Sequence, residues 1–388
     1  MSTDVKGPIT GSPVAGPDPS QEGGRGGADV KRIVGGLVGM VVTGYLMWTI
    51  FLSISIYPGI YLDNRVIVAV VAITVGVGGA AVLFRFLNMF VEGLPSAASQ
   101  RFMPYAYLLP GFGLIGLVLL YPAVQTVIYS FANADSTAWV GFDNYIEIFG
   151  REEFQTTLIN NLLWLLIVPA SVVAIGIVVA VLSDKLGRRG ESVSKSLMFL
   201  PMAISFVGAS AIWGLVYAYD NPGRSQTGLL NAVWTAFGGD PQTWLQIDTA
   251  KLNSILLMVI VIWLQVGFAM ILLSSAIKGV PEDTLEAARI DGATEWQIFW
   301  RVVIPQIKGT TITVFITVLI MVMKIFDIVY VLTNGAFNTN VIANLFFFEL
   351  FKRQDAGAAS AIVVVLLIAI IPVLVYQVRH FRREDVSS

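Results

Sequence analysis

The chain contains no cysteine and only one histidine among its 388 residues. Without cysteine it can form no disulfide, no thiolate nucleophile and no cysteine-ligated metal site. The one histidine, His380, lies near the C-terminus among arginines, where we expect a solvated side chain rather than a catalytic base. Catalysis by a nucleophile and a base therefore has almost no residues available to it.

Charged residues are also scarce, at 13% of the chain, whereas hydrophobic residues make up 56%. The mean hydropathy of +0.75 is too high for a water-soluble globule of this length, so we expect an integral membrane protein. The net charge of -2 provides no basic surface for nucleic acid.

Several motifs of enzymes are missing. No Gly-x-x-x-x-Gly-Lys-Ser/Thr loop occurs anywhere, so we expect no nucleotide to bind to this chain. The apolar segments contain no paired aspartates, no Ser-His dyad and no His-Glu-x-x-His, which argues against a membrane-embedded protease. We therefore expect no enzyme activity and no cofactor or metal in this chain.

The apolar residues are grouped in runs that are long enough to cross about 30 Å of hydrocarbon as helices. Residues 1–29 are rich in Gly, Pro, Ser and Asp and are expected to form a disordered tail. The sequence then predicts an all-α membrane protein with eight transmembrane helices, at about 33–56, 66–90, 106–131, 160–183, 196–219, 253–275, 308–331 and 356–378.

The basic residues of the connections predict the orientation of these helices. If the N-terminus is cytoplasmic, that side receives fourteen Lys and Arg residues, and the opposite side receives six. This difference satisfies the positive-inside rule and places both termini in the cytoplasm. On the outside, the segments at about 132–159 and 220–252 are long enough to form either ordered lids on the helix ends or contacts with a soluble partner.

A polar segment precedes the seventh predicted span, and its signals predict two short helices. Pro281 suits a first helical turn, and Gly292 suits a left-handed stop. Thr294 and Gln297 match a capping box, so a second helix is expected to run from there until Pro305 breaks it.

The same segment resembles the EAA loop of bacterial ABC importer membrane subunits, whose pattern is Glu-Ala-Ala, three residues, Gly, nine residues and Ile-x-Leu-Pro. Here Val302 and Ile304 occupy the two aliphatic positions. The resemblance implies a coupling loop at 276–307 that docks on a separate ATPase subunit. Its implied docking residues are Glu286, Ala287, Ala288, Asp291, Gly292 and Pro305. The alternative is an interfacial amphipathic hairpin that only seals the helix bundle.

From about 106 to 382 the chain is similar to the sugar permeases of the maltose-transporter type, and most similar to their alpha-glucoside branch. The supporting stretches are Gly141-Phe142-Asp143-Asn144-Tyr145, Phe199-Leu200-Pro201, Thr243-Trp244-Leu245-Gln246-Ile247-Asp248, Lys324-Ile325-Phe326-Asp327 and Leu332-Thr333-Asn334-Gly335. Residues 30–105 then resemble two additional N-terminal helices ahead of a six-helix importer domain.

This resemblance implies the partners of the chain. They are a dimer of ATP-binding subunits that holds ATP and Mg²⁺, a second homologous permease that forms a heterodimer with this chain, an extracytoplasmic solute-binding protein and membrane lipid. The implied location is the bacterial inner membrane.

Five residues are candidates for the substrate pathway. Lys324 and Asp327 are costly at membrane depth, so they are expected to face the bundle interior and to pair along one helix face, either as a structural ion pair or as the wall of a polar cavity. Trp263, Gln265 and Phe268 suit sugar rings and hydroxyls, although aromatic residues in membrane helices also serve packing.

By resemblance, the sugar contacts of the maltose importer fall on Val261, Leu264, Gln265, Val318, Val322 and Ile325, of which five are apolar.

We therefore expect the permease subunit of an ATP-driven importer for an alpha-linked di- or oligosaccharide. The alternative is a secondary transporter that an ion gradient drives, for which Asp327 is the only intramembrane carboxylate.

Overall fold

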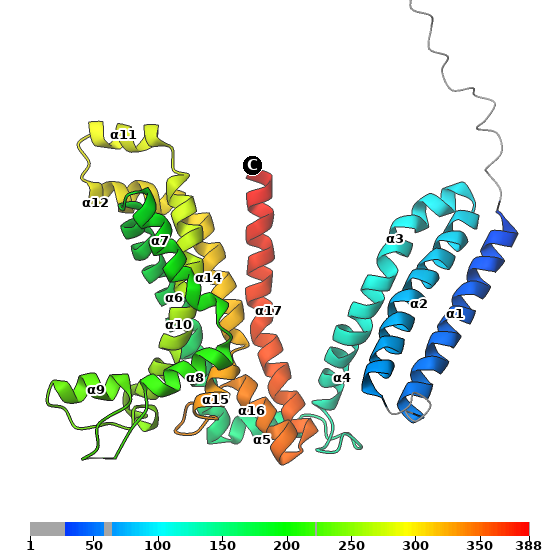
Figure 1. Cartoon of the computed structure of the whole chain (residues 1–388), viewed down its shortest axis with the longest axis horizontal. Coiled ribbons are helices and arrows are strands. Elements are labelled where there is room, and N and C mark those ends of the chain that lie inside the picture. The colour runs from blue at the N-terminus through cyan, green and yellow to red at the C-terminus, as the bar shows by residue number, and fades with distance from the viewer. Residues whose placement is uncertain (1–27, 58–63, 222, 388) are drawn as a thin grey trace, which may run out of the picture. The chain divides into compact units, whose positions relative to one another are not determined.

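The computed structural model describes residues 28–57, 64–221 and 223–387, and all the named secondary-structure elements there are helices. Residues 1–27 of the expected tail and the side chain of His380 lie outside the described part of the chain. The contacts divide the protein into one unit that ends at Pro122 and a second that begins at Ala123. Figure 1 shows the helices of both units.

Six helical segments in the described residues are long and apolar enough to cross a membrane. They are α1 (Val30–Ile56), α2 (Arg65–Gly93), the continuous run of α3 (Ser96–Ile115), η3 (Gly116–Leu120) and α4 (Tyr121–Tyr129), then α6 (Glu152–Asp184), α10 (Leu252–Lys278) and α17 (Ala356–Ser387). Two further helix pairs pass the same test only when each bent pair is taken as one span. The all-α membrane class is confirmed, and the number of spans is six, or eight with both bent pairs.

The expected unbroken helix at 196–219 is wrong. α7 (Arg188–Phe199) and η4 (Leu200–Ala203) are followed by α8 (Phe206–Val216) after a bend of 102°. Pro201 near the start of η4 cannot donate a backbone hydrogen bond to the preceding turn. The Ser205 hydroxyl then accepts the Gly208 N–H at 3.1 Å and begins a new helix in another direction.

In the first unit, α1 and α2 pack through glycine. Gly36 and Gly39 of α1 are buried. A Cβ on Gly39 would lie 2.2 Å from the Phe86 ring, and one on Gly36 would lie 2.7 Å from the Phe90 backbone. These small residues allow the two helix backbones to approach closely, as is typical of helix pairs in membranes.

In the second unit, α6 and α10 form the centre of the core together with α14 (Lys308–Met323). Gly176 of α6 faces Ala269 of α10, and a Cβ on the glycine would lie 2.8 Å from the alanine Cβ. Trp164 of α6 and Leu257 and Met270 of α10 are completely buried in the same core.

The segments predicted as external loops are ordered and contain short helices. These are α5 (Asp143–Gly150), α9 (Leu229–Ala236), η5 (Trp244–Gln246) and η6 (Thr249–Lys251). The buried Asn144 amide donates to the carbonyls of Ser130 and Ala132, at 2.9 and 2.7 Å. The buried Asn231 carbonyl oxygen accepts the Trp244 indole N–H at 2.9 Å. Buried amides therefore stabilise the internal structure of both loops.

Three short elements follow α14. They are α15 (Asp327–Leu332), α16 (Ile342–Phe348) and the π-helix η8 (Glu349–Arg353). The residues between α15 and α16 form a loop at 333–341 in which three residues other than glycine have positive φ angles. These are Asn334, Phe337 and Asn338.

Candidate functional site

The polar segment before α14 begins with a short exposed helix, α11 (Glu282–Ile290), which follows Pro281 at its N-cap. Glu286 and Ala287 are exposed, whereas Leu285 and Ala288 pack against the core of the second unit. Because residues on the two sides of the helix differ in this way, α11 lies on the surface of the bundle with one face free (Figure 1).

The turn after α11 depends on Gly292, whose φ angle is +81°. Nothing lies within 4 Å of a Cβ placed there, so the backbone angle alone requires glycine. Asp291 caps the helix by donating its N–H to the Ala287 carbonyl, and the Ala293 N–H reaches the Ala288 carbonyl at 3.0 Å. The left-handed stop predicted at Gly292 is confirmed.

An ion pair joins the two helices of the segment. Arg289 near the end of α11 donates to Glu295 at the start of α12 (Glu295–Ile298), at 2.9 Å. This hydrogen bond raises the pKa of the Arg289 guanidinium above its ordinary value, so the pair stays ionised. The capping box is also present, because Gln297 donates its N–H to the Thr294 hydroxyl and accepts the Thr294 N–H.

The sequence analysis predicted that Pro305 breaks the second helix, but the helix does not break there. α12 continues through the π-helix η7 (Phe299–Val303) into α13 (Ile304–Gln306), and the bend of 68° before α14 lies at Ile307. Pro305 occupies the first turn of α13. The wider π turn gives the proline ring room and needs no hydrogen bond from its nitrogen, which explains why the helix continues.

Apolar side chains remain exposed on this pair of helices. Ile290 is 86% exposed and Trp296 is 70% exposed. Trp296 contacts Trp300 edge to face, with ring centroids 5.6 Å apart. Exposed large apolar groups next to Glu286 and Ala287 are typical of a surface that another molecule covers.

A charge cluster that the sequence analysis missed lies beneath the segment. Lys195 of α7 contacts Asp184 at 3.1 Å and Glu191 at 2.6 Å, and Lys278 at the end of α10 pairs with the same two carboxylates. Ser274 donates to Asp184 at 2.8 Å. The i,i+4 spacing of Glu191 and Lys195 is visible in the sequence, but the contacts with α6 and α10 require the tertiary structure. The cluster joins three helices directly before α11.

The candidate pathway residues of α10 are engaged in packing to different degrees. Trp263 contacts Trp213 of α8 edge to face, with centroids 5.8 Å apart, and Phe268 packs against the main core. Gln265 is half-buried. The five apolar positions matched to sugar contacts are all buried in the core of this chain, and they are Val261, Leu264, Val318, Val322 and Ile325.

Lys324 and Asp327 do not share a helix face. α14 ends at Met323, and α15 begins at Asp327 after Phe326 with a φ angle of −139°. Among the described residues no ion pair joins the two side chains. The expectation of a pair along one helix is therefore wrong, because the backbone breaks between them. Their role in the substrate pathway stays a prediction.

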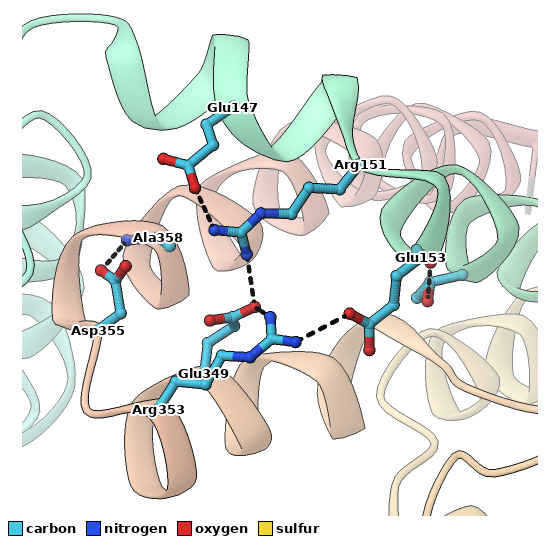
Figure 2. Close-up of polar contacts among 8 residues, drawn as sticks. Glu147, Arg151, Glu153, Glu349, Arg353, Asp355 and Ala358 are labelled. Atoms are coloured by element: carbon cyan, nitrogen blue, oxygen red, sulfur yellow. Dashed lines mark hydrogen bonds and ion pairs between the residues drawn. The ribbon is translucent and has the colours of Figure 1, made fainter.

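At the opposite end of the second unit, a buried carboxylate lies at the centre of ion pairs that connect three elements (Figure 2). Glu349 of η8 is 1% exposed and accepts a hydrogen bond from Arg151 at 2.8 Å and another from Arg353. Arg151 also pairs with Glu147 of α5, and Arg353 reaches Glu153 of α6 at 3.3 Å. Two of these pairs have i,i+4 spacing, but Arg151 and Glu349 are 198 residues apart.

The chain is similar to a known family and to several known proteins. The model of the family described as binding-protein-dependent transport system inner membrane component matches residues 172–384. The alpha-glucoside transport system permease protein AglF of Rhizobium meliloti is 40% identical over 83% of this chain and 99% of the relative. The osmoprotective compounds uptake permease protein GgtC of Synechocystis sp. is 45% identical over 72% of this chain and 99% of the relative.

The fold is also similar to that of a solved structure. A crystal structure of a bacterial ABC transporter involved in the import of the acidic polysaccharide alginate contains a chain that matches with a TM-score of 0.62 at 22% identity, over 73% of this chain and 96% of that chain. The family match and the two relatives establish that this chain belongs to the binding-protein-dependent transport system inner membrane components, the multi-pass permeases of ABC importers.

Proposed function

We propose that this chain is the permease subunit of an importer for a di- or oligosaccharide of the alpha-glucoside, maltose or trehalose type. The pair of exposed helices at 282–306 carries the proposal, because it offers Glu286, Ala287 and Ile290 to a soluble partner. The identity with an alpha-glucoside permease over most of the chain supports the class of cargo.

In this proposal, a dimer of separate ATP-binding subunits holds ATP and Mg²⁺ and docks on α11. A second homologous permease completes the pathway, and an extracytoplasmic binding protein delivers the solute. Closure of the ATP-binding subunits moves α11, and the Arg289 to Glu295 pair makes α12 move with it. Lys278 and the charge cluster beneath it pass this movement to α6 and α7. The bundle then alternates between two conformations.

The orientation that this mechanism needs has both termini and α11 in the cytoplasm of a bacterial inner membrane. The natural absence of cysteine makes a direct test possible. In intact cells, a membrane-impermeant maleimide is expected to label Asn338→Cys but to label Thr284→Cys only after permeabilisation. Labelling of Thr284→Cys in intact cells would disprove the orientation.

The function is tested by expressing the chain with the ATP-binding subunit, second permease and binding protein of its own organism, and by measuring uptake of labelled maltose and trehalose. Glu286→Ala is expected to abolish uptake and co-purification of the ATPase. Glu282→Ala, which removes the same charge from the first turn of α11, is the matched control and retains both. Uptake that stops when ion gradients collapse while ATP is maintained would instead support an ion-driven carrier.

A second cargo class is an osmoprotective solute. The 45% identity with an osmoprotective compounds permease favours it. Competition of unlabelled osmoprotectants with labelled trehalose, measured at low and high external salt, separates the two classes.

A further inference from the structure

A groove of about 520 Å³ lies between α6 and the helices that follow α11. One wall is a single face of α6, from Ala174 through Val178 to Leu182, and it ends at Lys185. The other wall consists of Phe299, Trp300 and neighbouring apolar residues of α12 and η7. At 1.5 Å per residue, the α6 wall is about 16 Å long.

The polarity of the groove changes along its length. The α6 wall is apolar up to Leu182. The groove is also lined by two cations and one carboxylate, which are Lys185, Arg289 and Glu295. Arg289 and Glu295 pair with each other, which leaves the Lys185 charge as the net charge of this end. The exposed Trp296 also lines the groove, and aromatic residues of this kind favour the interface between lipid and water.

We propose that this groove binds one anionic phospholipid, with an acyl chain along α6 and the phosphate near Lys185. An apolar channel with a cationic end matches an amphiphile that has an apolar tail and an anionic headgroup. The proposal goes beyond the proposed function and rests on it only for the side of the membrane that the groove faces.

Two other occupants fit less well. The apolar part of the α6 wall, from Ala174 to Leu182, belongs to a helix that can cross the membrane, which favours a lipid tail there over a soluble ATPase. A helix of the second permease, which is about 10–12 Å in diameter, would have to place an anionic residue next to Lys185, whereas the phosphate of a lipid is itself anionic.

The test uses the whole importer complex in vesicles that contain a trace of a phosphatidylglycerol with a photoactivatable acyl chain, or the matching phosphatidylcholine. In the native complex, the phosphatidylglycerol probe is expected to label peptides that contain residues 174–185 and 296–303 more strongly than the phosphatidylcholine probe. Lys185→Gln is expected to reduce this phosphatidylglycerol labelling by about fivefold, because one basic residue near an anionic surface contributes a factor of this size. Lys308→Gln, an exposed lysine outside the groove, is the control and leaves the labelling unchanged.

A second pair of variants tests the apolar wall. Val178→Phe places a ring in the groove and is expected to reduce labelling by both probes there. Ile175→Phe adds the same ring to an exposed α6 position that does not line the groove, and it leaves the labelling unchanged.

Equal labelling by both probes that Lys185→Gln does not alter would overturn the proposal and make this an ordinary lipid-facing surface. Absence of lipid labelling together with cross-links from Val178 to the second permease would assign the groove to that protein instead. Co-purification of the ATPase is recorded for each variant, so that failure of the lipid site can be distinguished from failure of the proposed function.

Discussion

The two ends of the second unit are held in different ways. At the α11 end, the loop is built from local elements: the left-handed Gly292, the capping box of Thr294 and Gln297, and a pair from Arg289 to Glu295 six residues away. At the other end, the contacts join distant parts of the chain. Arg151 binds Glu349, and the Asn160 amide donates to the carbonyls of residues 338 and 340.

Local contacts join the two helices of this segment to each other, while Leu285 and Ala288 pack them on the core, so we expect the pair to move as one body. Distant contacts instead fix the positions of α5, α6, η8 and the loop at 333–341 relative to one another. In the proposed mechanism we therefore expect the α11 end to transmit movement and the Glu349 end to keep its structure. Loss of each contact tests this difference.

The largest effect is expected for Glu349→Gln at the second end. The substitution removes the buried negative charge that both arginines contact, and hydrogen bonds to a charged group contribute about 1.5–3 kcal/mol each, so we expect a loss of about 3 kcal/mol. Thermal unfolding of the purified protein measures the loss. Glu147→Gln, which removes the exposed partner of Arg151, is the control and is expected to shift the midpoint little.

The next largest effect is expected for Gly292→Ala. Its cost is about 1–2 kcal/mol for a left-handed backbone, with no steric clash to add to it. Faster hydrogen exchange confined to residues 282–306 would show that the effect is local. Asn tolerates this conformation better, so Gly292→Asn should recover most of the protection, and an equal loss in both variants would contradict this explanation.

Thr294→Ala removes the capping hydroxyl from α12 and is expected to destabilise that helix by about 1 kcal/mol. Hydrogen exchange of residues 295–298 reports the change, and Thr294→Ser is expected to behave like the native protein. Spread of the effect to the Glu349 end would refute the distinction between the two ends.

The smallest effect is expected for the charge cluster below α11. Lys278→Glu or Glu191→Lys alone is expected to lower uptake per ATP hydrolysed by about threefold or less, because the Lys278 side chain is half exposed and solvent screens its ion pairs. The double variant restores the pair between positions 191 and 278 but places like charges beside Lys195 and Asp184, so it should recover part of the native ratio. If it recovers none of it, the pair has no part in passing movement from α11 to α10.

Helices were predicted correctly from the sequence where the signal is local or purely compositional, and wrongly where a break lies inside an apolar run. Long apolar runs predict membrane helices, because lipid provides no hydrogen-bond partners to the backbone. Pro281, Gly292 and the capping box predicted α11 and the start of α12, since each acts within one helical turn. The expected helices at 196–219 and 308–331 were wrong because the breaks near Pro201 and after Met323 occur inside continuous apolar runs.

The amino-acid sequence by itself determined the membrane class, the apolar helices and the polar segment that resembles an EAA loop, because each depends on composition or on residues within a few positions of one another. Only the tertiary structure decided that Glu349 is the buried centre of a network, that Lys278 joins Asp184 and Glu191, and that the apolar face of α6 borders a groove. Those features depend on which distant segments pack together, and that is set by the fit of whole helix surfaces rather than by any local pattern.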